Sequence, residues 1–293
     1  MQQEGLPVGS RFEIAYYSGT GCTAMVADCL YEALKQKACE GNMQFISEKA
    51  TSPGQHDILF LLFPVHSFNA PEAVYRWIDG IDRVDRTPAV VLAVSGGGDI
   101  VPNAAGSFSS IKRLEARGYS VVYDKIIVMP SNFIVATNEL LAVRLLEVLP
   151  VKLAAVVDEV LSGVVLRPRR RLVDRVVSRL GEAEKPMTAS FGKAIQVSES
   201  CINCEWCCNH CPAGNIHSPE GRPVFEGKCH LCLNCLYGCP SNSLIAGKMK
   251  FVLIKEGFDL KGLKRRMPLN EPVDVEKLAK GYLWSGVRKY LLE

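Results

Sequence analysis

The sequence has little net charge, no long hydrophobic run and no segment typical of export. Its 34 Lys and Arg residues nearly balance 31 Asp and Glu residues, and a formal net charge of +3 is too small to indicate a nucleic-acid-binding protein. The longest apolar run, residues 58–65, is far shorter than the roughly 20 residues of a membrane-spanning helix. The first residues lack the basic and apolar stretches of a secretory signal, so we expect a cytoplasmic protein without a membrane span.

The chain is long enough for two domains, and its first half alternates between strand and helix patterns. With 293 residues, 48% of them hydrophobic, it can bury more than one apolar core. Two runs, 58–65 and 88–94, are apolar almost throughout, as strands are when helices cover both faces of a parallel sheet. The alternation predicts a doubly wound α/β domain over residues 11 to about 162. The predicted strands are 11–18, 43–47, 57–65, 88–94 and 120–128, and the predicted helices begin near residue 24 and cover 71–79, 109–117 and 138–161.

Cysteine is abundant and unevenly distributed. Nine of the 12 Cys residues lie between Cys201 and Cys239, and a disulfide framework is not expected there, because thiols stay reduced in the cytosol. Eight of them fall into two runs of identical spacing, C-x2-C-x2-C-x3-C-P. Cys208 lies inside the first run but out of register, and we interpret Cys29 and Cys39 as ordinary buried or helix-end cysteines.

The spacing of the two runs indicates iron–sulfur clusters. A four-iron cube needs thiolates aimed at separate corners, and gaps of two residues wrap three of them around one face, while the fourth comes from elsewhere. Zinc, the alternative, also accepts four thiolates, but zinc ribbons place two C-x2-C pairs well apart. Here three cysteines crowd together with a fourth and a proline, twice over. The pattern favours two [4Fe–4S] clusters.

The segment from about 194 to 250 resembles a bacterial two-cluster ferredoxin, in which the fourth Cys of each run crosses to the other cluster. This resemblance implies a small α+β domain with two sets of four ligands. Cluster one would be held by Cys201, Cys204, Cys207 and Cys239, and cluster two by Cys229, Cys232, Cys235 and Cys211.

A glycine- and hydroxyl-rich turn follows the first predicted strand. Ser18-Gly19-Thr20-Gly21-Cys22-Thr23 leads into a predicted helix, where free backbone N–H groups and the helix dipole favour an anion. The turn also fits G-x-G-x-x-A, the dinucleotide fingerprint. The hydroxyls of Ser18, Thr20 and Thr23 suit a phosphate monoester better than a pyrophosphate, and no acidic residue about twenty positions on is placed to hold a ribose. FMN is therefore favoured, with NAD as the alternative.

Residues 11 to about 162 resemble a flavodoxin, whose phosphate loop reads Ser/Thr-x-Thr-Gly-x-Thr. The resemblance implies a flavodoxin-like sheet that binds FMN at its switch point, through loops after the first, third and fourth strands. Cys22 stands where such loops commonly have Asn, and only His66 and Phe68 offer rings for the isoalloxazine. His66 either tunes or protonates the flavin or is a loop residue without flavin contact. The implied FMN-binding residues are Ser18, Gly19, Thr20, Gly21, Cys22, Thr23, Pro64, Val65, His66, Ser67, Phe68, Asn69, Ala70, Ser95, Gly96, Gly97 and Gly98.

The whole chain resembles the flavodoxin–ferredoxin fusion proteins of anaerobic bacteria and archaea, including Met129-Pro130-Ser131-Asn132 after the fifth predicted strand. The resemblance implies an iron–sulfur flavoprotein that relays electrons between its clusters and FMN and carries them between partner redox proteins. An FMN-dependent reductase of a small organic substrate is the alternative, and no catalytic residue is assigned. We expect a flavodoxin-like domain (1–162), a basic linker helix (163–193), a two-cluster ferredoxin-like domain (194–250) and a C-terminal extension with an amphipathic helix (251–293).

Overall fold

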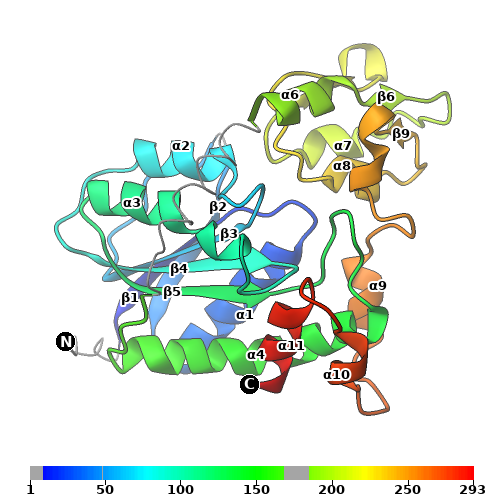
Figure 1. Ribbon diagram of the computed structural model, residues 1–293. Coiled ribbons are helices and arrows are strands. Elements are labelled where there is room, and N and C mark those ends of the chain that lie inside the picture. Colours follow the sequence, from blue (N-terminus) through cyan, green and yellow to red (C-terminus); the bar gives the residue numbers. More distant parts are fainter. Residues whose placement is uncertain (1–8, 48, 168–184) are drawn as a thin grey trace.

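The computed structural model describes residues 9–47, 49–167 and 185–293, and its first half is built on one parallel sheet (Figure 1). The strand order is β2-β1-β3-β4-β5, with every neighbouring pair parallel. This is the order of flavodoxin-like doubly wound sheets, and it confirms the predicted α/β architecture. The strands are β1 (Arg11–Tyr16), β2 (Glu40–Phe45), β3 (Ile58–Pro64), β4 (Pro88–Ser95) and β5 (Ser120–Val128).

Helices cover both faces of the sheet, and this explains why β3 and β4 are apolar throughout. Successive side chains of a strand point to opposite faces, so Phe60 and Leu62 pack against α1 and α4, whereas Leu59 and Leu61 pack against α2 and α3 (Figure 1). The helices are α1 (Cys22–Gln36), α2 (Glu72–Gly80), α3 (Phe108–Ala116) and α4 (Glu139–Leu161), with a short 3-10 turn η1 (Asn103–Ala105).

Two details differ from or extend the predicted elements. Strand β2 begins three residues earlier than predicted, because it pairs with β1 from Glu40 onward, and its polar side chains suit the edge of the sheet. Asn138 is the N-cap of helix α4, and its side chain accepts hydrogen bonds from the N–H groups of Leu140 and Leu141. The helix continues through Pro150. No helix within the described ranges is both long enough and apolar enough to cross a membrane.

The Cys-rich part is small and lies beyond the carboxyl ends of the strands (Figure 1). It has two short antiparallel pairs, β6 with β9 and β7 with β8, around a minor core that includes Phe191, Leu233 and Val252. The linker helix predicted over 163–193 falls largely outside the described residues, which resume at α6. The elements are α6 (Lys185–Lys193), β6 (Gln196–Val197), α7 (Trp206–Asn209), β7 (Ile216–His217), η2 (Pro219–Gly221), β8 (Val224–Phe225), α8 (Asn234–Gly238), β9 (Leu244–Ile245) and η3 (Gly247–Val252).

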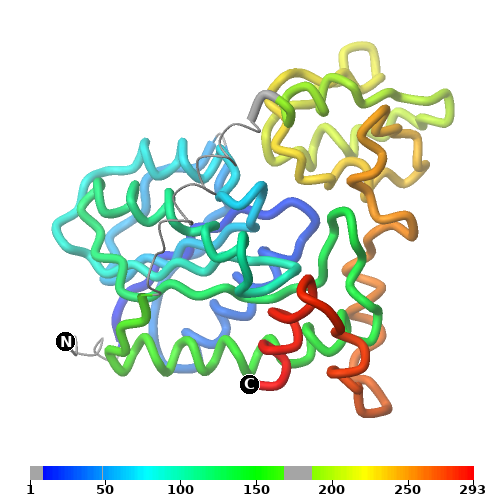
Figure 2. Tube along the Cα trace, in the orientation of Figure 1, coloured from blue at the N-terminus to red at the C-terminus, as the bar shows by residue number. Residues whose placement is uncertain are grey.

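The chain then returns to the first half and runs beside α4 to its end (Figure 2). The amphipathic helix predicted for this tail is divided into two, because Gly281 adopts a left-handed conformation (φ +80°) between them. Asp274 caps the first of these two helices, α10, and accepts a hydrogen bond from the Lys277 N–H at 3.0 Å. The tail helices are α9 (Leu260–Arg265), α10 (Val275–Leu278) and α11 (Ser285–Leu292).

Candidate functional site

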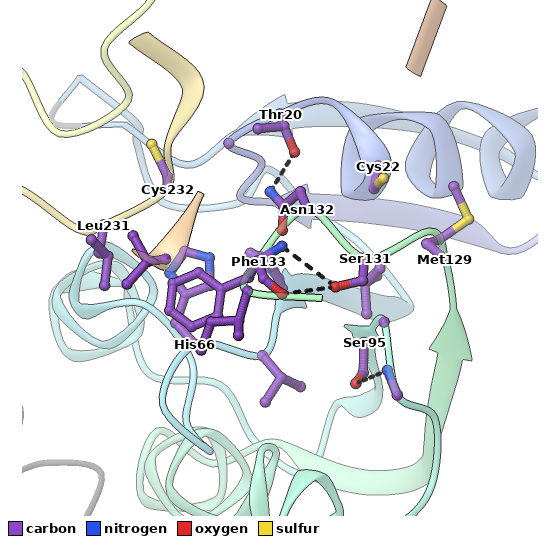
Figure 3. Close-up of a pocket in the computed structure, with 18 of the residues that line it drawn as sticks. Thr20, Cys22, His66, Ser95, Met129, Ser131, Asn132, Phe133, Leu231 and Cys232 are labelled. Carbon is purple, nitrogen blue, oxygen red and sulfur yellow. Dashed lines mark hydrogen bonds between the residues drawn. The ribbon is translucent and has the colours of Figure 1, made fainter. Parts of the chain in front are cut away.

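The loops that follow β1, β3 and β4 surround a cavity of about 530 Å³ at the carboxyl ends of the strands (Figure 3). Parallel strands end at one edge of a sheet, so loops distant in sequence meet there. The structure brings most of the predicted FMN-binding residues into this cavity wall. They are Ser18, Gly19, Thr20, Cys22, Thr23, Pro64, Val65, His66, Ser67, Phe68, Ser95, Gly96 and Gly97.

Four predicted residues support the loops without lining the cavity. Gly21 is left-handed (φ +101°) at the start of α1, a conformation that suits glycine. Asn69 pairs its backbone with that of His66 in a tight turn, and the buried Ala70 follows this turn. Gly98 lies against the backbone of the tail helix α11, where an added Cβ would be 2.7 Å from the carbonyl carbon of Gly286.

The end of the cavity beside α1 is polar and uncharged. The Ser18 hydroxyl accepts a hydrogen bond from the Ala24 N–H at 3.2 Å, and the Thr20 hydroxyl accepts one from the Asn132 side-chain amide at 2.7 Å (Figure 3). Each hydroxyl therefore still has its own hydrogen to donate. Helix α1 begins without a side-chain cap, and within the described part of the chain no Lys, Arg, Asp or Glu lines the cavity. This end suits an anion held by neutral donors.

Cys22 and His66 are half-buried at the cavity and uncharged at neutral pH. Burial raises the pKa of the Cys22 thiol to about 12. Burial lowers the pKa of His66 to about 4, although a hydrogen bond to the backbone of His230 acts in the opposite direction. The Nδ1 atom of His66 is buried without a hydrogen-bond partner. A buried polar atom without a partner is costly in free energy, so this nitrogen indicates a place for a polar ligand atom.

Other parts of the cavity wall carry no signal in the sequence. The loop after β5 contributes Phe133 and its neighbours, the Cys-rich part contributes Leu231 and Cys232, and the tail contributes Trp284. The cavity wall therefore offers more aromatic rings to a planar ligand than the two predicted ones, His66 and Phe68. The wall residues that the sequence did not indicate are Val94, Asn103, Phe133, Ile134, Val135, Met187, Leu231, Met249, Phe251, Val252, Leu283 and Trp284.

The cysteines predicted for cluster one meet around a small cavity of their own. Cys201, Cys204, Cys207 and Cys239 all line it, together with prolines and serines. Burial acts to raise the pKa of Cys239, but hydrogen bonds from the hydroxyls of Ser243 and Ser241 outweigh it and lower that pKa. The fourth cysteine of the second run thus joins the first three of the first run.

The cysteines predicted for cluster two also lie together. Burial raises the pKa of the Cys232 thiol to about 12, and the nearby thiols of Cys229 and Cys211 act in the same direction. The pKa of Cys235 is raised by burial and then by four neighbouring thiols, those of Cys232, Cys229, Cys211 and Cys207. A bound cation would replace the proton on each sulfur and offset the cost of burying a thiolate. The donor set therefore fits a metal-bound group.

The two runs share the same unusual backbone. In each run the residues on either side of the second Cys are left-handed: Asn203 and Glu205 (φ +53° and +55°) correspond to Leu231 and Leu233 (φ +54° and +61°). Non-glycine residues rarely adopt this conformation, and leucine gains nothing from it locally. Because the strain recurs at equivalent positions, the two runs are coiled in the same way.

Hydrogen bonds to sulfur are repeated as well. The Asn215 N–H donates to the Sγ of Cys211, and the Ser243 N–H donates to the Sγ of Cys239, each at 3.3 Å. Among the residues that the structure describes, no three His, Cys, Asp or Glu side chains converge closely enough to ligate a single metal ion. A four-iron cube holds its thiolates farther apart than one ion does, so this finding leaves the cluster assignment untested.

The chain matches no known protein family and no curated protein. It is similar to the solved structure of a rubredoxin oxygen:oxidoreductase from the anaerobe Desulfovibrio gigas, with 12% identity, coverage of 59% of this chain and 37% of that one, and a TM-score of 0.37. It is also similar to flavodoxin 2 from Bacillus cereus (16% identity, 51% and 99% coverage, TM-score 0.37). A general stress protein 14 in complex with FMN from Treponema denticola gives 11% identity, 51% and 99% coverage, and a TM-score of 0.38. These scores are low, so the functional conclusion rests on the site itself.

Proposed function

We propose that the chain is an iron–sulfur flavoprotein that binds FMN in the cavity, holds two [4Fe–4S] clusters and relays electrons between partner redox proteins. The observation that carries the proposal is the shared wall: Cys232, a predicted cluster ligand, lines the same cavity as the phosphate loop. A protein that only bound FMN would not need a cluster ligand there. The division into an FMN-binding part (1–162) and a cluster-binding part (194–250) belongs to this proposal.

The cavity fits FMN in size and in chemistry. About 530 Å³ lies within the usual range of pockets for small organic ligands. The phosphate would be held by the hydroxyls of Ser18, Thr20 and Thr23 and by the backbone N–H groups where α1 begins. The isoalloxazine would lie along the apolar remainder, where the unpartnered Nδ1 of His66 offers one polar contact. FMN supplies the ability to accept electrons singly or in pairs.

The protein's own contribution is to orient the cofactors and to exclude charge from the cavity. His66 is neutral at physiological pH because burial lowers its pKa to about 4, so it acts as a hydrogen-bonding group and not as a cation. Asn132 links the phosphate loop to the loop after β5 through Thr20, and so fixes two sides of the cavity relative to each other. The eight cysteine thiolates would ligate the clusters, with N–H···S bonds that influence their reduction potentials.

A direct reductase is the second candidate, and exposed apolar side chains at the mouth of the cavity are the observation that favours it. Phe133, Phe251 and Leu283 line the cavity yet remain exposed, with Phe251 exposed at 64%. Such a rim suits either a flat apolar substrate or the docking surface of a partner protein. Repeated turnover of a quinone, an enone or a ferric compound by the reduced protein would establish the reductase; its absence would leave the carrier.

The first experiment is anaerobic purification followed by iron, sulfide and flavin analysis with a visible spectrum. The proposal predicts about eight irons and about one FMN per chain. Eight irons without flavin, even after incubation with FMN, would reject the flavoprotein and leave a cluster-binding protein. Flavin without iron would reject the clusters.

A further inference from the structure

We propose that cluster two is the direct electron partner of the flavin and that cluster one exchanges electrons with the flavin only through cluster two. This inference rests on the proposed function and adds an order to it. One electron passes from reduced cluster two to the flavin, oxidising the former and reducing the latter. Cluster one, reduced by an external one-electron donor protein, then returns cluster two to its reduced state. Two such cycles, with two protons from solvent, reduce the flavin by one electron pair.

The contact between the phosphate loop and a ligand of cluster two is the first reason. A Cβ added to Gly19 would lie 2.7 Å from the Cβ of Cys232 and 3.0 Å from its carbonyl oxygen. Gly19 therefore allows the backbone of the phosphate loop to contact the backbone of Cys232. A larger residue at this position would displace Cys232. Figure 3 shows Cys232 and Leu231 at the same side of the cavity as Thr20.

Two tyrosines hold this contact in place. The Tyr17 hydroxyl and the Nδ1 of His230 are 3.0 Å apart, which ties the end of β1 to the residue after Cys229. The Tyr237 hydroxyl donates to the carbonyl oxygen of Asn132 at 2.9 Å and accepts from the Ile254 N–H at 2.9 Å. His230 lies between Cys229 and Cys232, and Tyr237 lies on α8, the helix that carries Cys235. These bonds therefore hold three proposed ligands of cluster two against the cavity.

Cluster one faces elsewhere. Its four cysteines line a separate cavity, and none of them lines the flavin cavity. Cys204 is exposed, and the neighbouring Ile202 is 63% exposed. The two ligand sets nevertheless adjoin, because the Asn234 side-chain amide, at the start of the helix that carries Cys235, donates to the carbonyl oxygen of His210, at the end of the helix that carries Cys207, at 2.8 Å. Since electron transfer slows steeply with distance, the geometry favours the route from solvent through cluster one and cluster two to the flavin.

Paired substitutions of cluster ligands test the order of the clusters through the midpoint potential of the flavin. Cys229→Ala/Cys235→Ala removes cluster two, and Cys201→Ala/Cys204→Ala removes cluster one; each variant should keep about four irons and its FMN. Loss of the negatively charged cluster two should raise the flavin midpoint potential at least twice as much as loss of cluster one, because charge interactions weaken with distance. An equal or reversed shift would overturn the proposal.

Tyr237→Phe provides a test in which all eight ligands remain. It removes the hydroxyl that holds cluster two to Asn132, and Tyr119→Phe is the control, since that hydroxyl only contacts His56, a residue outside the cavity. After rapid reduction of the clusters by a one-electron reductant, flavin reduction should slow several-fold in Tyr237→Phe and stay unchanged in the control. Equal rates in the two variants would overturn the inference. A wild-type protein without eight irons or without FMN would instead reject the proposed function.

Discussion

The tail is fastened to the cavity by a contact between glycines, and Gly98→Ala tests how much this contact contributes. An alanine at residue 98 must adopt a φ of +75° and place its Cβ 2.7 Å from the Gly286 carbonyl carbon. The left-handed conformation costs about 1–2 kcal/mol. Overpacking against backbone that cannot rotate away adds about 1–3 kcal/mol. Gly281→Ala is the matched control, because Gly281 has a φ of +80° with nothing within 4 Å of an added Cβ, so only the conformational cost applies.

Urea unfolding followed by circular dichroism would measure both free energies, and flavin titration of the apoprotein would measure FMN affinity. Gly98→Ala should lose about 1–3 kcal/mol more than Gly281→Ala. It should also bind FMN more weakly, since displacement of α11 moves Leu283 and Trp284 out of the cavity wall. Equal destabilisation by the two substitutions, with equal FMN affinity, would refute the role assigned to the glycine contact.

Three further predictions concern single side chains. Cys208→Ala should keep about eight irons, whereas Cys207→Ala should lose iron from cluster one, as measured by metal analysis; equal losses would contradict the register of the first run. Burial lowers the pKa of His66 from 6.5 to about 4, so the unfolded chain binds a proton that the folded chain excludes, and stability should fall as the pH falls through this interval. In His66→Gln the free energy of unfolding, measured by urea titration, should fall with pH by up to about 3 kcal/mol less than in the wild type. An unchanged dependence on pH would contradict the lowered pKa of His66. Thr20→Val should weaken FMN binding about tenfold in fluorescence titrations, because it removes the partner of Asn132 and a phosphate donor; unchanged affinity would argue against that phosphate position.

The sheet and its loops could be predicted because their signals are local. Strand β5 has its predicted bounds, 120–128. Strands β3 and β4 could be predicted from their continuous apolar residues, which are buried on both faces of the sheet. Strand β2 was placed three residues too late, since an edge strand with polar residues lacks that signal. The loops of the cavity followed from the rule that parallel strands end at one edge of the sheet.

The tail side of the cavity could not be predicted, because it depends on contacts between distant residues. The Tyr282 hydroxyl donates to the carbonyl oxygen of Val101, a residue 181 positions earlier, and no pattern near either residue indicates the pair. The same holds for Trp284, whose place in the cavity depends on Gly98 and Gly286. The continuous tail helix was expected from apolar spacing, and Gly281 interrupts it.

The repeated backbone of the two Cys runs makes them interdependent halves of the Cys-rich part. Every ligand of the second run stands 28 positions after its counterpart in the first, as Cys229 stands after Cys201, and the left-handed residues keep this offset. The side chains at those left-handed positions differ between the copies, so the shared backbone shape does not depend on which residues stand there. In the proposed ligand sets each copy gives its last cysteine to the other's set, so neither copy would complete a cluster by itself. Loss of either copy would therefore remove ligands from both proposed clusters.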